Sequence, residues 1–251
     1  MLSKNNIKFI NSLRQKKYRQ IHHHFFVEGE KMVKEALRSG FNIQQIIATE
    51  NGLKSFNEEL LNKQQLIIAD EKELKKISSF TTASNIFAVI EIPNTELKKN
   101  IEKEICIGIE EINDPGNLGT IIRIADWFGI KTIYCSTNSV DVYNPKVVQA
   151  TMGAIFRVNV IYCNLEEIVN IYKSKLKVYG TFMMGNNLFQ EKLSNEGLIL
   201  FGNESKGLSK KLESLVDYKI TIPNFSKENV KTESLNISSA VAIVCAQFRN
   251  K

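Results

Sequence analysis

The sequence predicts an α/β protein in two parts, a small α/β sandwich over residues 1–93 and a larger α/β domain over residues 105–251. Short apolar runs alternate with helical patterns along the whole chain. A polar stretch, residues 94–104, separates the two parts as a linker, and the apolar runs after it are typical of strands in a mostly parallel, buried sheet. The 251 residues, 43% hydrophobic and 24% charged, provide a core of globular composition and exclude disordered and fibrous classes.

The first part is expected to begin with a helix that Ser3 caps, followed by alternating strands and helices. Asp70 opens a later helix, and Glu73 stands three residues on, which is the spacing of a capping box. Another helix is expected over residues 30–40 and ends at Gly40. The strands are expected at residues 25–29, 43–48, 66–69 and 86–92.

The second part is expected to alternate strands with helices in the manner of a parallel sheet. Its last helix, residues 238–248, is small and apolar on nearly all sides, so the sheet or a second subunit must cover it. The first of its helices should begin near Leu118. The strands are expected at residues 105–112, 132–135, 157–162, 177–182, 198–202 and 218–223, and the earlier helices at 121–129, 145–153 and 166–175.

The positive charge is concentrated near the start of the chain. The net charge is +6, and the first forty residues alone carry nine Lys and Arg against three Asp and Glu. Basic residues gathered on one segment favour a polyanionic partner such as nucleic acid, although a solvated helix surface carries the same signal.

Several classes of protein are excluded by what the sequence does not contain. Cys106, Cys135, Cys163 and Cys245 lie far apart with no CxxC pair, which indicates reduced thiols and neither a disulfide scaffold nor a cysteine zinc site. No apolar run approaches the roughly 20 residues of a membrane span, and the amino terminus does not resemble a signal peptide. The three histidines, residues 22–24, are consecutive and cannot converge on a metal or serve a distant nucleophile. We therefore expect a soluble cytoplasmic protein without a metal site.

Three loops at the carboxyl ends of predicted strands carry the candidate chemistry, because open α/β sheets bind ligands there. The first precedes a helix in which Arg123 lies off the apolar stripe. The second places Glu204 between two glycines, and the third places Ser234 and Asn236 before the last helix. Each has a plain structural alternative: a surface arginine, a strand-to-helix turn, and helix capping.

Taken together, in this order and spacing, the three loops resemble the signature motifs of the SpoU (TrmH) family of RNA ribose 2′-O-methyltransferases over roughly residues 105–250. The first part, with the segment 25–37, is similar to the L30e-like substrate-binding domain of many family members that act on rRNA. The residues that match the motifs are Asn117, Gly119, Arg123, Ala125 and Gly129 in motif one, Gly202, Asn203, Glu204 and Gly207 in motif two, and Ile222, Pro223, Ser234, Leu235 and Asn236 in motif three.

The resemblance implies a SPOUT domain whose trefoil knot forms a pocket for S-adenosylmethionine (SAM), and it implies a homodimer. The motif-three loop, residues 224–233, departs from the family pattern because it is longer and contains no glycine. The residues that the resemblance places against SAM are Thr181, Gly202, Asn203, Gly207, Ile222 and Leu235.

The implied reaction is transfer of the SAM methyl group to a ribose 2′-hydroxyl. Arginine is a poor base near neutral pH, so we expect Arg123 to hold a neighbouring phosphate and stabilise developing alkoxide charge, with the general base open. Asn117 and Glu204 would orient Arg123 and the ribose, while Ser234 and Asn236 hold the motif-three loop. Ribosomal RNA is the expected substrate, with tRNA or a non-catalytic RNA-binding role as alternatives. The residues expected to contact RNA phosphates are Lys4, Lys8, Arg14, Lys16, Lys17 and Arg19.

Overall fold

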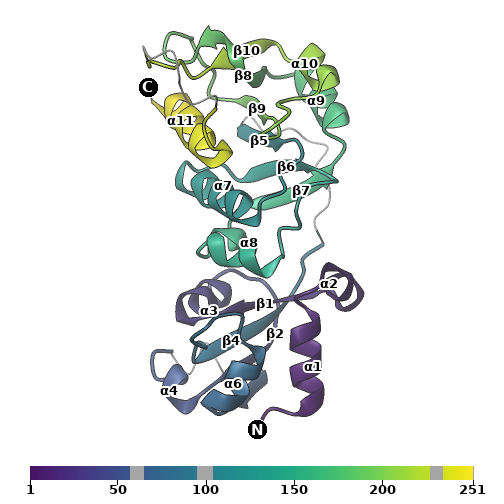
Figure 1. Ribbon diagram of the computed structural model, residues 1–251, viewed down its shortest axis with the longest axis vertical. Helices are drawn as coiled ribbons and strands as arrows, with labels where there is room; N and C mark the ends of the chain where they lie inside the picture. The colour runs from purple at the N-terminus through teal and green to yellow at the C-terminus, as the bar shows by residue number, and fades with distance from the viewer. Residues whose placement is uncertain (57–64, 95–103, 227–233, 251) are drawn as a thin grey trace. The chain divides into compact units, whose positions relative to one another are not determined.

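The computed structural model describes residues 1–56, 65–94, 104–226 and 234–250, which form two compact units (Figure 1). The first unit comprises residues 1–94 together with residues 141–157. The second unit comprises residues 95–140 and 158–251. The expected linker, residues 94–104, lies outside the described residues except at its two ends.

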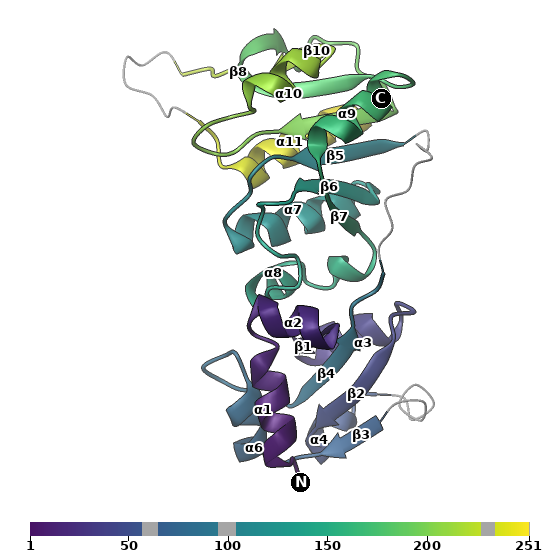
Figure 2. The same cartoon turned by 90° about the vertical axis from the view of Figure 1, so that its right-hand side faces the viewer.

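The first unit is built on a four-stranded sheet of order β1-β4-β2-β3, in which β4 runs antiparallel to β1 and β2 while β2 and β3 are parallel. Helices α1 and α6 lie side by side on one face of this sheet (Figure 2). The strands are β1 (His24–Glu28), β2 (Ile43–Ala48), β3 (Gln65–Ile68) and β4 (Ile86–Glu91). The helices are α1 (Lys4–Ser12), α2 (Lys16–His22), α3 (Glu30–Leu37), α4 (Glu50–Leu53), α6 (Glu71–Ile77), α8 (Pro145–Ala150) and the short 3-10 helix η1 (Ala154–Phe156).

Side-chain hydrogen bonds fix the helix starts of this unit. The Ser3 hydroxyl accepts a hydrogen bond from the Asn6 amide at 3.1 Å, so α1 begins where the sequence predicts. Asp70 and Glu73 form the expected capping box, each carboxylate accepting from the other residue's backbone N–H. These bonds satisfy amides that have no partner within the helix.

The core of the first unit occupies both faces of its sheet. Phe26 packs among the apolar residues of α1 and α6, and the alternation of a strand sends its neighbour Phe25 to the other face. There the Phe25 ring lies 4.7 Å from the ring of Tyr143 and 6.5 Å from that of Phe156, measured between centroids. Residues 141–157 therefore supply part of this core although they lie far from residues 1–94 in the chain.

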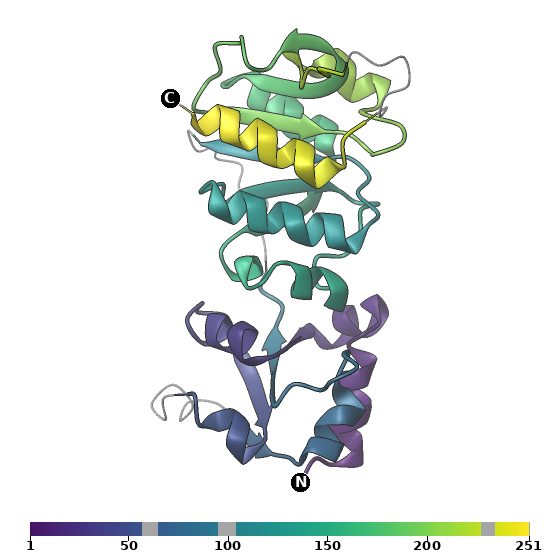
Figure 3. The same cartoon turned by 60° about the vertical axis from the view of Figure 1, so that its left-hand side comes forward.

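The second unit contains a six-stranded sheet of order β10-β8-β9-β5-β6-β7, in which every pair of neighbours is parallel. Helices α7 and α11 pack together on one face (Figure 3), and α9 and α10 cover the other. The strands are β5 (Ile105–Ile109), β6 (Thr132–Ser136), β7 (Asn159–Cys163), β8 (Val178–Asn187), β9 (Gly197–Phe201) and β10 (Tyr218–Thr221). The helices are α7 (Pro115–Trp127), α9 (Leu165–Lys173), α10 (Lys210–Leu215) and α11 (Ile237–Arg249).

The α/β class and the parallel sheet expected from the sequence are confirmed, with two corrections in the second unit. Helix α7 begins at Pro115 rather than near Leu118, because Asp114 caps it and proline suits the first helical position. Strand β8 continues to Asn187, because its second half pairs with β10 after a shift in register. Within the described residues, no helix combines the length and the apolar composition needed to cross a bilayer.

Candidate active site

The three motif loops follow β5, β9 and β10, whose carboxyl ends lie at the same edge of the parallel sheet. The first loop runs directly into α7, where the Asp114 side chain accepts a hydrogen bond from the Asn117 amide at 2.7 Å. Asn117 is thereby fixed in the first turn of α7. The third loop runs into α11, and Asn236 is its N-cap.

One residue from each motif meets in a hydrogen-bonded cluster, Asn117, Glu204 and Asn236. The Asn117 side-chain amide donates to Glu204 Oε1 at 2.6 Å. The Asn236 side-chain amide donates to Asn117 Oδ1 at 3.0 Å and lies 3.4 Å from Glu204 Oε1. Asn117 is thus joined to Glu204, 87 positions later in the chain, and to Asn236, 119 positions later.

Asn236 both caps α11 and belongs to this cluster. Its Oδ1 accepts hydrogen bonds from the amides of Ser238 and Ser239, while its Nδ2 donates into the cluster. The capping bonds fix the orientation of the side chain, so its donor group is held toward Asn117. Asn236 therefore caps the helix and takes part in the cluster at the same time.

Arg123 lies on the solvent face of α7 and not in this cluster. It is exposed and makes no hydrogen bond or ion pair with any residue that the structure describes. Thr120 and Trp127 lie three and four positions away on the same stripe of the helix, and the Trp127 side chain is 85% exposed. The guanidinium therefore keeps all its donors for an external acceptor such as a phosphate.

The glycines of motif two are required by the loop itself. A Cβ on Gly202 would lie 2.1 Å from the carbonyl carbon of Gly207, and Gly207 has a φ of +69°. Asn203 and Gly207 exchange two backbone hydrogen bonds of 3.0 and 2.8 Å, which close the loop on either side of Glu204. The tight closure presents the Glu204 carboxylate at the tip of the loop.

The motif-three residues lie on both sides of a stretch that the structure does not describe. Ile222 and Pro223 follow β10, whereas Ser234 and Leu235 precede α11, and most of the loop 224–233 lies outside the described residues. Leu235 is 50% exposed although its side chain is apolar. Ser234 is exposed and, among the described residues, forms no hydrogen bond.

Thr181 lies within β8, not at its end as expected. Its hydroxyl donates to the Leu200 carbonyl oxygen of β9 at 2.9 Å, where the pairing of β8 with β9 stops. Farther along the same strand, Met183 and Met184 are 68% and 86% exposed.

The basic residues of the first unit separate into two kinds. Lys4, Lys8, Lys16 and Lys17 are exposed on α1 and α2. Arg14 is exposed too, although its guanidinium donates to the carbonyl oxygens of residues 77 and 78 beyond α6 at 3.1 and 2.5 Å. Their exposure leaves these five cations accessible to a polyanion.

Arg19 requires a correction, because it cannot reach a phosphate in this structure. Only 3% of its surface is exposed, and it forms an ion pair with Asp141. It also donates to the carbonyl oxygens of Leu13 and Arg14 at 2.8 and 2.9 Å. The sequence places Arg19 among five other cations of the same segment, and nothing in that pattern distinguishes a buried arginine from exposed ones.

The four cysteines are buried, free thiols. Burial raises the pKa of Cys163 to about 11 and that of Cys245 to about 12, so neither thiol is activated as a nucleophile. Among the described residues, no group of three or more His, Cys, Asp or Glu side chains is arranged to hold a metal ion.

Comparisons with known proteins agree with this arrangement. The model of the SpoU rRNA methylase family matches residues 104–246, and that of the MRM3-like substrate binding domain matches residues 4–88. The chain is 29% identical to the 23S rRNA (guanosine(2553)-2'-O)-methyltransferase RlmP of Bacillus subtilis, covering 97% of this chain and 95% of that protein.

Two solved structures are similar over nearly the whole chain. One, described as an RNA methyltransferase of the TrmH family from Porphyromonas gingivalis, is 34% identical with a TM-score of 0.90, covering 99% of this chain and 98% of that one. The other is an AdoMet-bound rRNA methyltransferase from Sinorhizobium meliloti, 26% identical with a TM-score of 0.86, covering 99% and 96%.

Proposed function

The chain belongs to the SpoU rRNA methylase family, and from this premise we propose that it transfers a methyl group from SAM to a ribose 2′-hydroxyl of ribosomal RNA. The observation that carries the proposal is the cluster of Asn117, Glu204 and Asn236, one residue from each motif, joined by hydrogen bonds at the carboxyl edge of the sheet. A degenerate, non-catalytic domain of the same fold would have no reason to retain this geometry together with an unpaired Arg123.

The cofactor site lies where the motif loops meet. Backbone groups around Gly202, Ile222 and Leu235 would hold SAM, Asn203 and Gly207 belong to the same loop as Gly202, and Thr181 would line the same pocket. The chemistry of these residues fits SAM, since they combine main-chain polar groups with the apolar side chains of Ile222 and Leu235. Bound SAM supplies a methyl group on a sulfonium that is already activated for transfer.

The protein's own task is then to position the ribose and to stabilise charge. Arg123, with every donor available, holds the phosphate beside the target ribose and stabilises negative charge that develops on the 2′-oxygen. Asn117 and Glu204 orient the ribose hydroxyls, because the Glu204 carboxylate still has Oε2 available among the described contacts. Asn236, as the N-cap of α11, holds the end of the motif-three loop, and Ser234 would assist from its place two residues before it.

RNA selection belongs to residues 1–93, which we propose as a substrate-binding domain followed by a linker at 94–104 and the methyltransferase domain at 105–251. The exposed cations of α1 and α2, Lys4, Lys8, Lys16 and Lys17, with Arg14 between the helices, supply phosphate contacts. Ribosomal RNA is favoured over tRNA because the matching catalytic family is that of SpoU rRNA methylases and the relative RlmP is a 23S rRNA methyltransferase.

The active form is proposed to be a homodimer in the cytoplasm. Trp127 on α7 is 85% exposed, and α7 packs against α11, whose Ala246 is also exposed. A second copy of the chain would cover this indole, since tryptophan is enriched in protein–protein interfaces.

The proposal is tested by transfer of labelled methyl from SAM to rRNA and to tRNA that lack ribose methylation, with Arg123→Ala as the control. Label in rRNA alone, lost in the variant, is the expected result. Label in tRNA alone would reassign the substrate, and no measurable SAM binding would favour the non-catalytic alternative.

A further inference from the structure

Glu111, in the loop after β5, adopts a backbone conformation that non-glycine residues avoid. Its φ is +52°, in the left-handed region, where a side chain crowds the following carbonyl group. Glycine would adopt the same conformation without strain. Such a conformation persists only where surrounding contacts over-determine it, so the contacts of Glu111 are informative.

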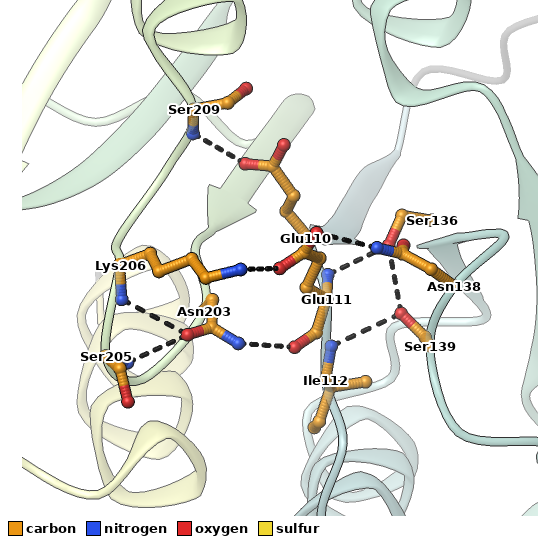
Figure 4. Close-up of polar contacts among 10 residues, drawn as sticks. All are labelled: Glu110, Glu111, Ile112, Ser136, Asn138, Ser139, Asn203, Ser205, Lys206 and Ser209. Carbon is orange, nitrogen blue, oxygen red and sulfur yellow. Dashed lines mark hydrogen bonds and ion pairs between the residues drawn. The ribbon is translucent and has the colours of Figure 1, made fainter.

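Four hydrogen bonds attach Glu111 to two neighbouring loops (Figure 4). Its backbone N–H donates to Ser136 Oγ at 2.8 Å, and its carbonyl oxygen accepts from Asn203 Nδ2 at 2.8 Å. Its carboxylate accepts from Asn138 Nδ2 at 2.7 Å and from Lys206 Nζ at 3.1 Å. Glu111 therefore joins the loops that follow β5, β6 and β9.

The loop after β9 is the one that carries Glu204. Asn203 Oδ1 accepts hydrogen bonds from the amides of Ser205 and Lys206 at 2.9 and 3.1 Å, which stiffens the turn. Glu111 holds this loop at two points, through its carbonyl oxygen at Asn203 and through its carboxylate at Lys206. Glu204 lies between the two anchor points.

The carboxylate of the preceding residue, Glu110, binds a different segment. Glu110 accepts a hydrogen bond from the Ser209 amide at 2.7 Å, at the start of α10, so the side chains of Glu110 and Glu111 diverge, as those of adjacent residues do.

Hydrogen bonds from Lys206 and Asn138 lower the pKa of the Glu111 carboxyl, which keeps it ionised at neutral pH. The ion pair to Lys206 is therefore present under ordinary assay conditions.

We propose that the Glu111 carboxylate is a positioning residue for methyl transfer, holding the loop of residues 203–207 so that Glu204 stays in register with Asn117. The inference rests on the proposed function. Glu111 then has two separate roles. Its main-chain bonds to Ser136 and Asn203 need only the left-handed backbone conformation. Its bonds to Asn138 and Lys206 need the carboxylate side chain.

Glu111→Gly tests this separation, since glycine keeps the backbone conformation and removes only the carboxylate. We expect the melting temperature to stay within about 2 °C of the wild type or to rise, because relief of strain offsets the added freedom of glycine in the unfolded chain. We expect kcat to fall by about ten- to a hundredfold through misplacement of Glu204, with SAM affinity changed less than about threefold. The amides of Ser205 and Lys206 should exchange hydrogen about tenfold faster.

Two further variants serve as comparisons. Glu111→Gln keeps a bond to Asn138 but loses the charge that attracts Lys206, so its kcat should lie between those of wild type and Glu111→Gly. His23→Gly is the matched backbone control, because His23 also has a positive φ, of 55°, is exposed, and forms no side-chain hydrogen bond to described residues. It should relieve the same strain and leave kcat and loop exchange unchanged.

Wild-type exchange rates at Ser205 and Lys206 in Glu111→Gly would overturn the inference, whatever the activity. So would a kcat within about twofold of the wild type, or a loss of kcat that only parallels a loss of melting temperature. Failure of the wild-type protein to methylate any RNA would contradict the proposed function instead, and the exchange comparison would still decide the role of Glu111.

Discussion

Replacing Asp141 with alanine is expected to destabilise the first unit strongly. Asp141 Oδ2 accepts from Nε of Arg19 at 3.0 Å and from Nη2 of the same guanidinium. Arg19 is 3% exposed and the Asp141 side chain 16% exposed, so water cannot replace the lost carboxylate. The variant leaves a buried positive charge with only the carbonyl oxygens of Leu13 and Arg14 as partners.

Two independent estimates give a similar magnitude for this loss. Hydrogen bonds to charged groups contribute about 1.5–3 kcal/mol each, and the variant removes the two that join Arg19 to Asp141, besides the one that the Tyr143 amide donates to Asp141 Oδ1. Breaking a buried ion pair by removing one partner costs about 3–5 kcal/mol. For a chain of this length each kcal/mol lowers the melting temperature by about 2–4 °C, so we expect a decrease of about 6–20 °C.

Chemical unfolding followed by far-UV circular dichroism measures this loss, and hydrogen exchange assigns it to the first unit. Glu213→Ala is the matched control, because it breaks an exposed pair with Lys219 (2.6 Å; side chains 39% and 48% exposed) that is expected to contribute less than about 1 kcal/mol. If Asp141→Ala is no more destabilising than this control, the argument that the pair anchors residues 141–157 in the first unit is wrong.

The other predictions concern the site, the partners and the thiols. Arg123→Ala should retain SAM affinity by calorimetry while losing methyl transfer; loss of both would make its role structural. Exchanging Lys4 and Lys8 for glutamine should weaken RNA binding and reduce the slope of log K against log salt by about one unit or more, whereas an unchanged slope would remove them from the interface. Trp127→Asp should convert the dimer to a monomer in light scattering, and an unchanged mass would place the interface elsewhere. Cys163, whose pKa burial raises to about 11, should have about one thiolate in a thousand at pH 8 and resist a thiol reagent until the protein unfolds; rapid labelling of the native protein would contradict this.

Local features of the fold could be predicted from the sequence because they depend on neighbouring residues. The Asp70–Glu73 capping box and the Ser3 cap are properties of four consecutive positions, and they appear as expected. The strand over residues 43–48 was expected from its apolar run and is found at the same bounds. Helix α7 begins earlier than expected because Asp114 caps it and Pro115 suits its first position, whereas its apolar stripe starts only at Leu118.

Long-range features could not be predicted in the same way. The order of the strands depends on which apolar surfaces meet, and a continuously apolar strand such as β9 does not encode its neighbours. Nothing in residues 141–157 indicates that Tyr143 and Phe156 pack beside Phe25, more than a hundred positions earlier. The same is true of Arg19, whose burial depends on Asp141.

The site was predictable in its main outline. Parallel strands bring their carboxyl ends together, so the meeting of Asn117, Glu204 and Asn236 follows from their positions after β5 and β9 and before α11. Glu111 was missed because its importance depends on a left-handed φ, and glutamate carries no sequence signal for that conformation.

The composition of the first unit from two separate segments has a consequence for how the protein is made. Synthesis proceeds from the amino terminus at about 5–20 residues per second, so the 63 residues from 95 to 157 take about 3–13 s to follow residue 94. For most of that interval Arg19 has no Asp141 and Phe25 has no Tyr143. The first unit therefore emerges from the ribosome first but cannot complete its fold at once. Its last segment, residues 141–157, is translated only after β5 and β6 of the second unit.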